Sequence, residues 1–102
     1  MKPNRETSAR RAAREQTALC EALVAMSDPP EMRALLADLC TPAELQALVD
    51  RWRVVQLLDE GLPYRRINEL TGVSVTTIGR VARFLADGAG GYRLALERTR
   101  KT

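Results

Sequence analysis

Residues 63–85, PYRRINELTGVSVTTIGRVARFL, are the stretch that decides the fold of this chain. Pro63 opens a short segment with helical periodicity, Gly72 interrupts it, and Ser74 precedes a second such segment. Glycine adopts the left-handed backbone of a turn without steric cost, and serine is a favoured N-cap. Apolar residues recur where two short helices joined by a turn would touch: Ile67, Leu70, Val73, Ile78 and Val81. The stretch therefore predicts a helix-turn-helix, with its second helix over residues 75–86.

The second helix of this motif has one polar side. At about 100° per residue, one stripe holds Thr76, Gly79, Arg80 and Arg83. The opposite stripe holds Ile78, Val81, Ala82 and Leu85. In a major groove, arginine bonds to guanine and threonine contacts bases or a thymine methyl, while glycine permits close approach. The polar stripe therefore indicates binding to double-stranded DNA.

Phosphate contacts are expected at both ends of this surface. The N-terminus of the helix capped by Ser74 offers free N–H groups and the positive end of the helix dipole. Tyr64, Arg65 and Arg66 on the preceding helix can reach the backbone phosphates that flank the groove.

The rest of the chain predicts further helices. Residues 6–26 are rich in Ala and long side chains at helical spacing, and Asp28 followed by two prolines starts a helix that ends near residue 40. Thr41, Pro42 and Glu44 supply an N-cap, a first-turn proline and a capping-box acid for a helix that closes at Gly61. Residues 92–98 form a last helix after a glycine-rich turn. The expected fold class is all-α.

One domain is expected for a chain of 102 residues. Within it, residues 1–62 would supply dimerisation helices with a basic N-terminal arm, and residues 63–86 the helix-turn-helix. Residues 87–102 would supply the glycine-rich turn, the last helix and a basic tail.

Charge and apolar patterning point to a homodimer. Residues 1–14 carry a net charge of +4, residues 15–60 carry −6 and residues 61–102 carry +5. A polyanion would be attracted by both ends of the chain and repelled by its middle. The second half of the central helix has apolar residues around most of its circumference: Val54, Val55, Leu57 and Leu58. Such a helix needs neighbours on several sides, and a second copy of the chain would provide them.

Several function classes are not expected. The chain has no histidine, which makes an enzyme or a metal site improbable. Its two cysteines, Cys20 and Cys40, lie in apolar helical patterns without ligand spacing and are predicted to be buried thiols. Without an apolar run of roughly 20 residues or a signal peptide, we expect a cytoplasmic protein that does not contact membranes.

A family resemblance covers about residues 35–85. The residues that carry it are TPAE at 41–44, RWRVV at 51–55, Gly61 and TIGR at 77–80, and they resemble the Trp repressor superfamily. The further elements YR at 64–65, TG at 71–72, RV at 80–81 and GGY at 90–92 are most similar to its YerC/YecD-like TrpR-related branch. The resemblance implies a six-helix protomer whose N-terminal helices intertwine with those of a partner and hold two recognition helices at a fixed separation.

The same resemblance assigns base-reading positions to Val75, Thr76 and Gly79, with Arg65 as the matching basic residue on the preceding helix. Together with the residues argued above, the predicted DNA-contacting set is Arg65, Arg66, Ser74, Val75, Thr76, Thr77, Gly79, Arg80 and Arg83.

A possible effector pocket also follows from the resemblance. In the tryptophan repressor, a threonine, two arginines, a glycine and a serine help to form the corepressor site. Thr41, Arg51 and Arg80 match the first three, whereas Val81 and Phe84 stand at the glycine and serine positions. These two residues should fill at least part of the slot that an indole needs. We therefore expect no cofactor and no response to L-tryptophan, while a small anionic or amino-acid-like effector stays possible.

Three functions compete. The first is a sequence-specific, dimeric transcription regulator, a repressor of the Trp repressor type. The second is a protein-interaction module whose basic face docks on an acidic partner. The third is an architectural DNA binder without sequence preference, which would bind in a salt-dependent way to any duplex.

Overall fold

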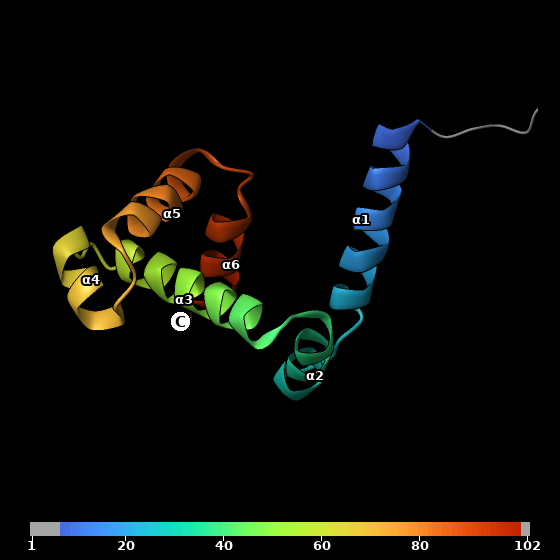
Figure 1. Cartoon of the computed structure of the whole chain (residues 1–102), viewed down its shortest axis with the longest axis horizontal. Helices are drawn as coiled ribbons and strands as arrows, with labels where there is room; N and C mark the ends of the chain where they lie inside the picture. The colour runs from blue at the N-terminus through green and yellow to red at the C-terminus, as the bar shows by residue number, and fades with distance from the viewer. Residues whose placement is uncertain (1–6, 101–102) are drawn as a thin grey trace, which may run out of the picture. The chain divides into compact units, whose positions relative to one another are not determined.

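The computed structural model describes residues 7–100, and this part of the chain contains only helices, turns and connecting segments. The helices are α1 (Ser8–Val24), α2 (Pro29–Leu39), α3 (Pro42–Asp59), α4 (Tyr64–Thr71), α5 (Val75–Asp87) and α6 (Gly91–Thr99) (Figure 1). Over these residues the prediction of an all-α chain with six helices is confirmed. The start of the basic arm, before residue 7, and the end of the basic tail, after residue 100, lie outside the described residues.

Two compact units make up the chain. The first ends at Thr41 and contains α1 and α2, and the second begins at Pro42 and contains α3 to α6. The boundary falls within the segment 1–62 that the sequence assigned to dimerisation. The central helix α3 is thus part of the same unit as the helix-turn-helix.

Helix starts in the first unit follow local signals. Asp28 caps α2, since its carboxylate accepts a hydrogen bond from the backbone N–H of Glu31 at 3.0 Å. Glu31 in return accepts from the backbone N–H of Ser27 at 2.7 Å. At the start of α1, the Thr7 hydroxyl accepts from the backbone N–H of Arg10 at 3.0 Å. The bonds to Asp28 and Thr7 satisfy donors that the first helical turn leaves unpaired, and the bond from Ser27 pairs the N–H just before the N-cap of α2.

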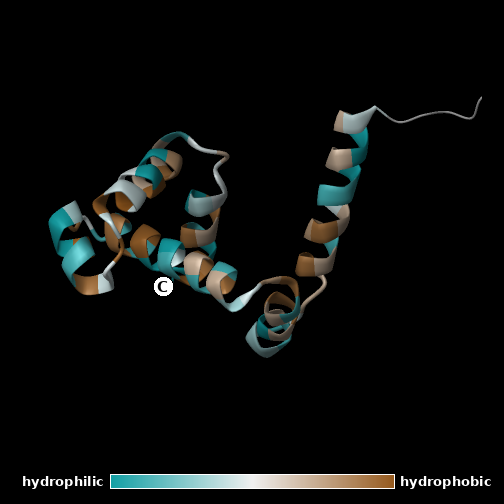
Figure 2. Cartoon of the chain, viewed as in Figure 1, coloured by the Kyte–Doolittle hydropathy of each residue, from teal (hydrophilic) through white to brown (hydrophobic). Residues whose placement is uncertain are grey.

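The first unit has no core of its own. Neither α1 nor α2 contains a buried residue, although the ribbon of each is coloured for hydrophobic as well as hydrophilic residues (Figure 2). Cys20 is exposed and Cys40 is only half-buried. The prediction of buried thiols is therefore wrong for the single chain, because the helices of this unit cover one another only in part.

The second unit is built around an aliphatic core. Its buried residues are Val54, Val55, Leu57, Ile67, Ile78, Val81 and Leu96. Helix α3 contacts both α4 and α5, α4 contacts α5, and α5 contacts α6. Trp52 is partly buried and packs against this core. The core thus places the two helices of the predicted DNA-binding motif on one supporting helix.

Two features lie at the end of α3. Gly61 adopts a left-handed backbone with φ +86° just after α3 ends at Asp59, where the sequence predicts that this helix closes. Arg100, at the end of α6, donates from Nη2 to Oδ2 of Asp59 at 3.0 Å and so connects the ends of α6 and α3. Within residues 7–100, no helix is long and apolar enough to cross a membrane.

Candidate DNA-binding helices and the adjoining pocket

The helix-turn-helix forms where the sequence predicts it. Gly72 ends α4 in the left-handed region at φ +74°. Any residue with a side chain would be strained in this backbone conformation, even though the space around it is open. Ser74 starts α5, since its hydroxyl accepts from the backbone N–H of Thr77 at 3.2 Å. Both local signals in the sequence are confirmed by this geometry.

Two side chains on α4 hold the turn in shape. The amide of Asn68 donates to the carbonyl oxygen of Val73 at 2.8 Å. The hydroxyl of Thr71 donates to the carbonyl of Ile67 at 2.7 Å and accepts from the backbone N–H of Val73 at 3.0 Å. These bonds occupy backbone groups that a tight turn would otherwise leave unpaired. Sequence reasoning did not assign this role, for which the only signal was two polar residues shortly before a glycine turn.

The apolar contacts of the motif agree with the sequence except at one position. Ile67 and Ile78 are completely buried and Val81 is 1% exposed. Leu70, which was predicted to pack between the helices, is 49% exposed, so that prediction is wrong for the single chain. The less exposed side of α4 holds Ile67, Asn68 and Thr71. Leu70 lies about 100° around the helix from Thr71 and points away from that side.

The outward side of α5 presents the residues expected to meet DNA. Thr76 and Arg83 are exposed, Val75 is 54% exposed, and Gly79 is half-buried. On this side the helix offers small, apolar and basic groups together with its capped N-terminus. A major groove accepts a surface of this kind.

Two exposed arginines lie on α4, the helix that precedes α5. The side chain of Arg65 is 91% exposed and its Nε lies 4.0 Å from Glu69, while Nη1 of Arg66 lies 3.4 Å from the same carboxylate. Exposed ion pairs of this kind contribute little to stability. Phosphate groups can therefore compete with Glu69 for both arginines.

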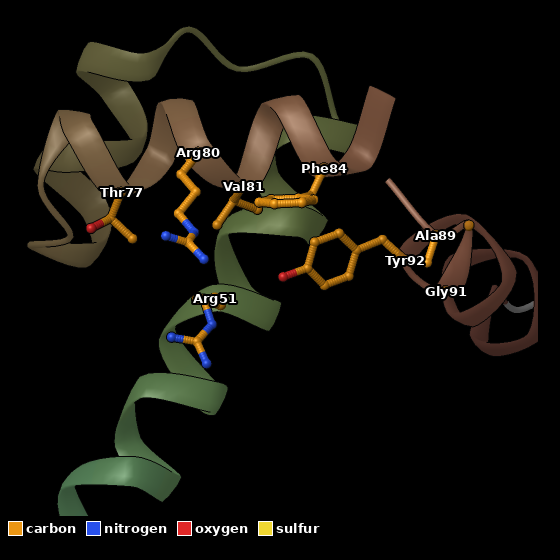
Figure 3. A pocket seen from close by; sticks show the side chains of 9 residues that line it. Arg51, Thr77, Arg80, Val81, Phe84, Ala89, Gly91 and Tyr92 are labelled. Atoms are coloured by element: carbon orange, nitrogen blue, oxygen red, sulfur yellow. The ribbon is translucent and has the colours of Figure 1, made fainter. Parts of the chain in front are cut away.

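Arg80 lies at the border of the outward side and does not extend away from the protein. Its side chain extends from α5 toward α3 (Figure 3), and its guanidinium carbon lies 5.5 Å from the centre of the Phe84 ring. The arginine is exposed, yet it also lines a pocket. The helical wheel assigned Arg80 to the groove stripe, and the family resemblance assigned it to an effector pocket as well; the structure places it in the lining of a pocket.

An open pocket of about 810 Å³ lies within the second unit. Its lining comes from α3, α5 and the segment that leads into α6: Arg51, Thr77, Arg80, Val81, Phe84, Ala89, Gly90, Gly91 and Tyr92. Of the five predicted effector residues, Arg51, Arg80, Val81 and Phe84 are brought together here. Thr41 is the last residue of the first unit, and its place in the pocket stays a prediction.

Phe84 lines this pocket and is 47% exposed. That Phe84 and Val81 fill part of the slot for an indole stays a prediction. Sequence reasoning missed Tyr92, which enters from α6 (Figure 3). The GGY triplet at residues 90–92 was part of the family resemblance but had no assigned role. Only the packing of α6 against α5 brings it to the pocket.

The pocket carries uncompensated positive charge. Among residues 7–100, neither Arg51 nor Arg80 forms an ion pair. The carboxylate of Asp50, the residue before Arg51, accepts a hydrogen bond from the side chain of Gln46 at 2.8 Å. Arginine binds carboxylate and phosphate groups through paired N–H donors. The site is therefore suited to an anionic group. The same part of the chain holds no cluster of Cys, Asp and Glu that could bind a metal ion.

Comparisons of sequence and structure with known proteins find Trp repressor proteins or proteins similar to them. The family model described as Trp repressor protein matches residues 14–100. The chain is 37% identical over 89 residues to the uncharacterized protein YerC of Bacillus subtilis (strain 168), covering 87% of this chain and 86% of YerC. A TrpR like protein from Eubacterium eligens superposes with a TM-score of 0.76 at 38% identity, covering 85% of this chain and 88% of that one. A crystal structure from Staphylococcus aureus gives the same TM-score at 33% identity over 85% of each chain. The chain belongs to the Trp repressor family, a family of non-enzymatic DNA-binding regulators.

Proposed function

We propose that this protein is a dimeric, sequence-specific transcription repressor that inserts α5 into the major groove of its operator. The observation that carries the proposal is the outward side of α5. Val75, Thr76 and Arg83 are exposed there on a helix whose other side is fixed to α3 by Ile78 and Val81. A helix held rigidly by its buried side can place base-reading groups reproducibly, whereas groups on a mobile segment would lose entropy on binding.

The dimer is argued from apolar surface that one chain leaves uncovered. In the first unit, Leu19, Val24 and Leu39 are 45%, 83% and 51% exposed. Helices of 17 and 11 residues without a buried face are marginal in water. A second copy, with its own α1 and α2, would cover these side chains in an isologous interface. Such a dimer would hold its two α5 helices about one DNA turn apart, roughly 34 Å.

The pocket would hold the effector, for which we propose a small anion and not L-tryptophan. Arg51 and Arg80 would bind its charged group. Phe84 and Tyr92 already bring two aromatic rings to the lining. Because Arg80 also borders the outward side of α5, a ligand bound to it would change the electrostatic field that DNA meets.

Selection of bound sequences from random duplexes is the experiment that tests this function. We expect a palindrome whose half-site centres lie about 10 base pairs apart. Sedimentation of the same preparation at micromolar concentration should show only a dimer. A single unrepeated site or a stable folded monomer would contradict the proposal. Salt-dependent binding without any enriched sequence would favour the architectural alternative, and no DNA binding at low salt would favour the protein-interaction module.

A further inference from the structure

Gly79 occupies a helical position where the protein itself has no need of glycine. It lies inside α5, and its φ is not among the positive values of the chain. A Cβ atom placed on Gly79 would lie 3.9 Å from Cε2 of Tyr64, which is ordinary van der Waals contact, and it would meet no other described atom outside its own helix within 4 Å. Alanine would therefore fit, and it would favour the helix more than glycine does.

Tyr64 fills part of the space beside that glycine. The residue begins α4, its side chain is 41% exposed, and the edge of its ring faces the backbone of α5 at Gly79. Its hydroxyl has no hydrogen-bond partner within the described part of the chain. Because the Cβ position of Gly79 meets only this ring atom at ordinary contact distance, the helix leaves room there for a group of the size of a methyl.

We propose that Tyr64 and Gly79 form a binding site for the 5-methyl group of a thymine in each half-site, here called the methyl seat. This inference rests on the proposed function and names a specificity determinant within it. In the major groove only thymine presents a methyl group, and apolar protein atoms recognise it by contact. Glycine leaves room for the methyl group, and the Tyr64 ring supplies the surface against which it packs. The hydroxyl of Tyr64 is left to bond with a neighbouring phosphate.

The test uses the full-length protein and the selected operator, with each thymine replaced in turn by deoxyuridine, which lacks only the methyl group. The wild-type protein should lose about fourfold in affinity at one position of each half-site, the effect of removing one buried methyl group. Tyr64→Ala should bring the ratio of affinities for the thymine and uracil duplexes close to one at that position. Gly79→Ala should do the same, because its own methyl group takes up the space.

Two further variants separate this role from a structural one. Tyr64→Phe keeps the ring and should retain the thymine-to-uracil ratio while it weakens binding to every duplex alike. Leu70→Ala, a truncation of a comparably exposed residue of α4, should leave the ratio unchanged. Circular dichroism checks folding, and Gly79→Ala, which adds a methyl group where space exists, keeps the test decisive if Tyr64→Ala fails to fold.

The outcomes distinguish the inference from the function on which it rests. A selected operator whose thymine methyl groups all leave affinity unchanged would overturn the methyl seat alone. The methyl seat would also be overturned if replacing thymine with deoxyuridine lowered the affinity of both Tyr64→Ala and Gly79→Ala as much as that of the wild-type protein. If no sequence is selected from random duplexes, the proposed function fails, and the methyl seat fails with it.

Discussion

The guanidinium carbon of Arg80 lies 5.5 Å from the centre of the Phe84 ring, one turn further along α5. A cation over an aromatic face at an exposed site is worth about 0.5–1 kcal/mol. Phe84 stands where the tryptophan repressor carries a serine, so in this protein a ring of the chain itself contacts the arginine. A planar ligand that stacks on Arg80 would compete with this ring.

L-Tryptophan should therefore fail to bind. Calorimetry with the dimer and L-tryptophan should show no saturable heat at micromolar to low millimolar ligand, and operator affinity should not change when the amino acid is added. The reason is that the ring of Phe84 stands beside Arg80 in the pocket lining, where it competes with an indole for space, and that Val81 removes the close backbone approach that a glycine would allow. Micromolar binding together with tighter operator binding would sink this prediction.

The double variant Val81→Gly, Phe84→Ser should acquire L-tryptophan binding, because both obstacles are removed at once. Val81 is 1% exposed, so its loss should also lower stability, and the thermal midpoint has to be measured alongside. Phe84→Ser alone is the matched control, and it should bind more weakly than the double variant. A folded double variant without any binding would mean that other residues decide the pocket's selectivity.

Thr76→Ala and Arg65→Ala should each reduce discrimination between operator and random DNA. Thr76 is exposed on α5, and the Arg65 side chain is 91% exposed on α4. Loss of a good base contact costs about 1–3 kcal/mol. Competition binding with both DNAs measures the ratio, and Thr99→Ala and Arg93→Ala on α6 are controls with the same chemistry. Equal losses on both DNAs would identify phosphate contacts.

Neutralising Arg10, Arg11 and Arg14 should weaken binding to all duplexes by the same factor. These residues belong to the basic start of α1, and we expect them to face phosphates and not bases. Each lost phosphate contact should reduce the slope of log affinity against log salt by about 0.9. The triple Arg→Lys variant keeps the charge and should keep the slope. An unchanged slope in the neutralised protein would show that this segment takes no part in binding.

Ile67→Ala should destabilise the protein far more than Leu70→Ala on the same helix. Ile67 is completely buried and Leu70 is 49% exposed. Truncation of a buried isoleucine costs about 2–5 kcal/mol, whereas surface changes stay within about 0.5 kcal/mol. Chemical denaturation at one fixed protein concentration compares them, because the stability of a dimer depends on concentration. Similar losses would mean that Leu70 is covered in the dimer.

Local signals were enough to predict the helices and the turn of the DNA-binding motif. Asp28 and Ser74 cap helices, and Gly61 and Gly72 adopt positive φ, as their residue types predict. Caps and turns depend on bonds between residues a few positions apart, so the chain carries this information wherever it is folded. The same local pattern was sufficient to indicate the Trp repressor family.

The sequence by itself therefore determined where each helix begins and ends and which residue types the motif offers to DNA. Only the tertiary structure decided which of these side chains are covered and what they face. Leu70 fits the apolar period yet is half exposed, Arg80 shares the groove stripe yet extends toward α3, and Tyr92 joins the pocket from α6. Periodicity identifies the sides of a helix, but burial and contact depend on where neighbouring helices lie, and that is set by the packing of the whole core.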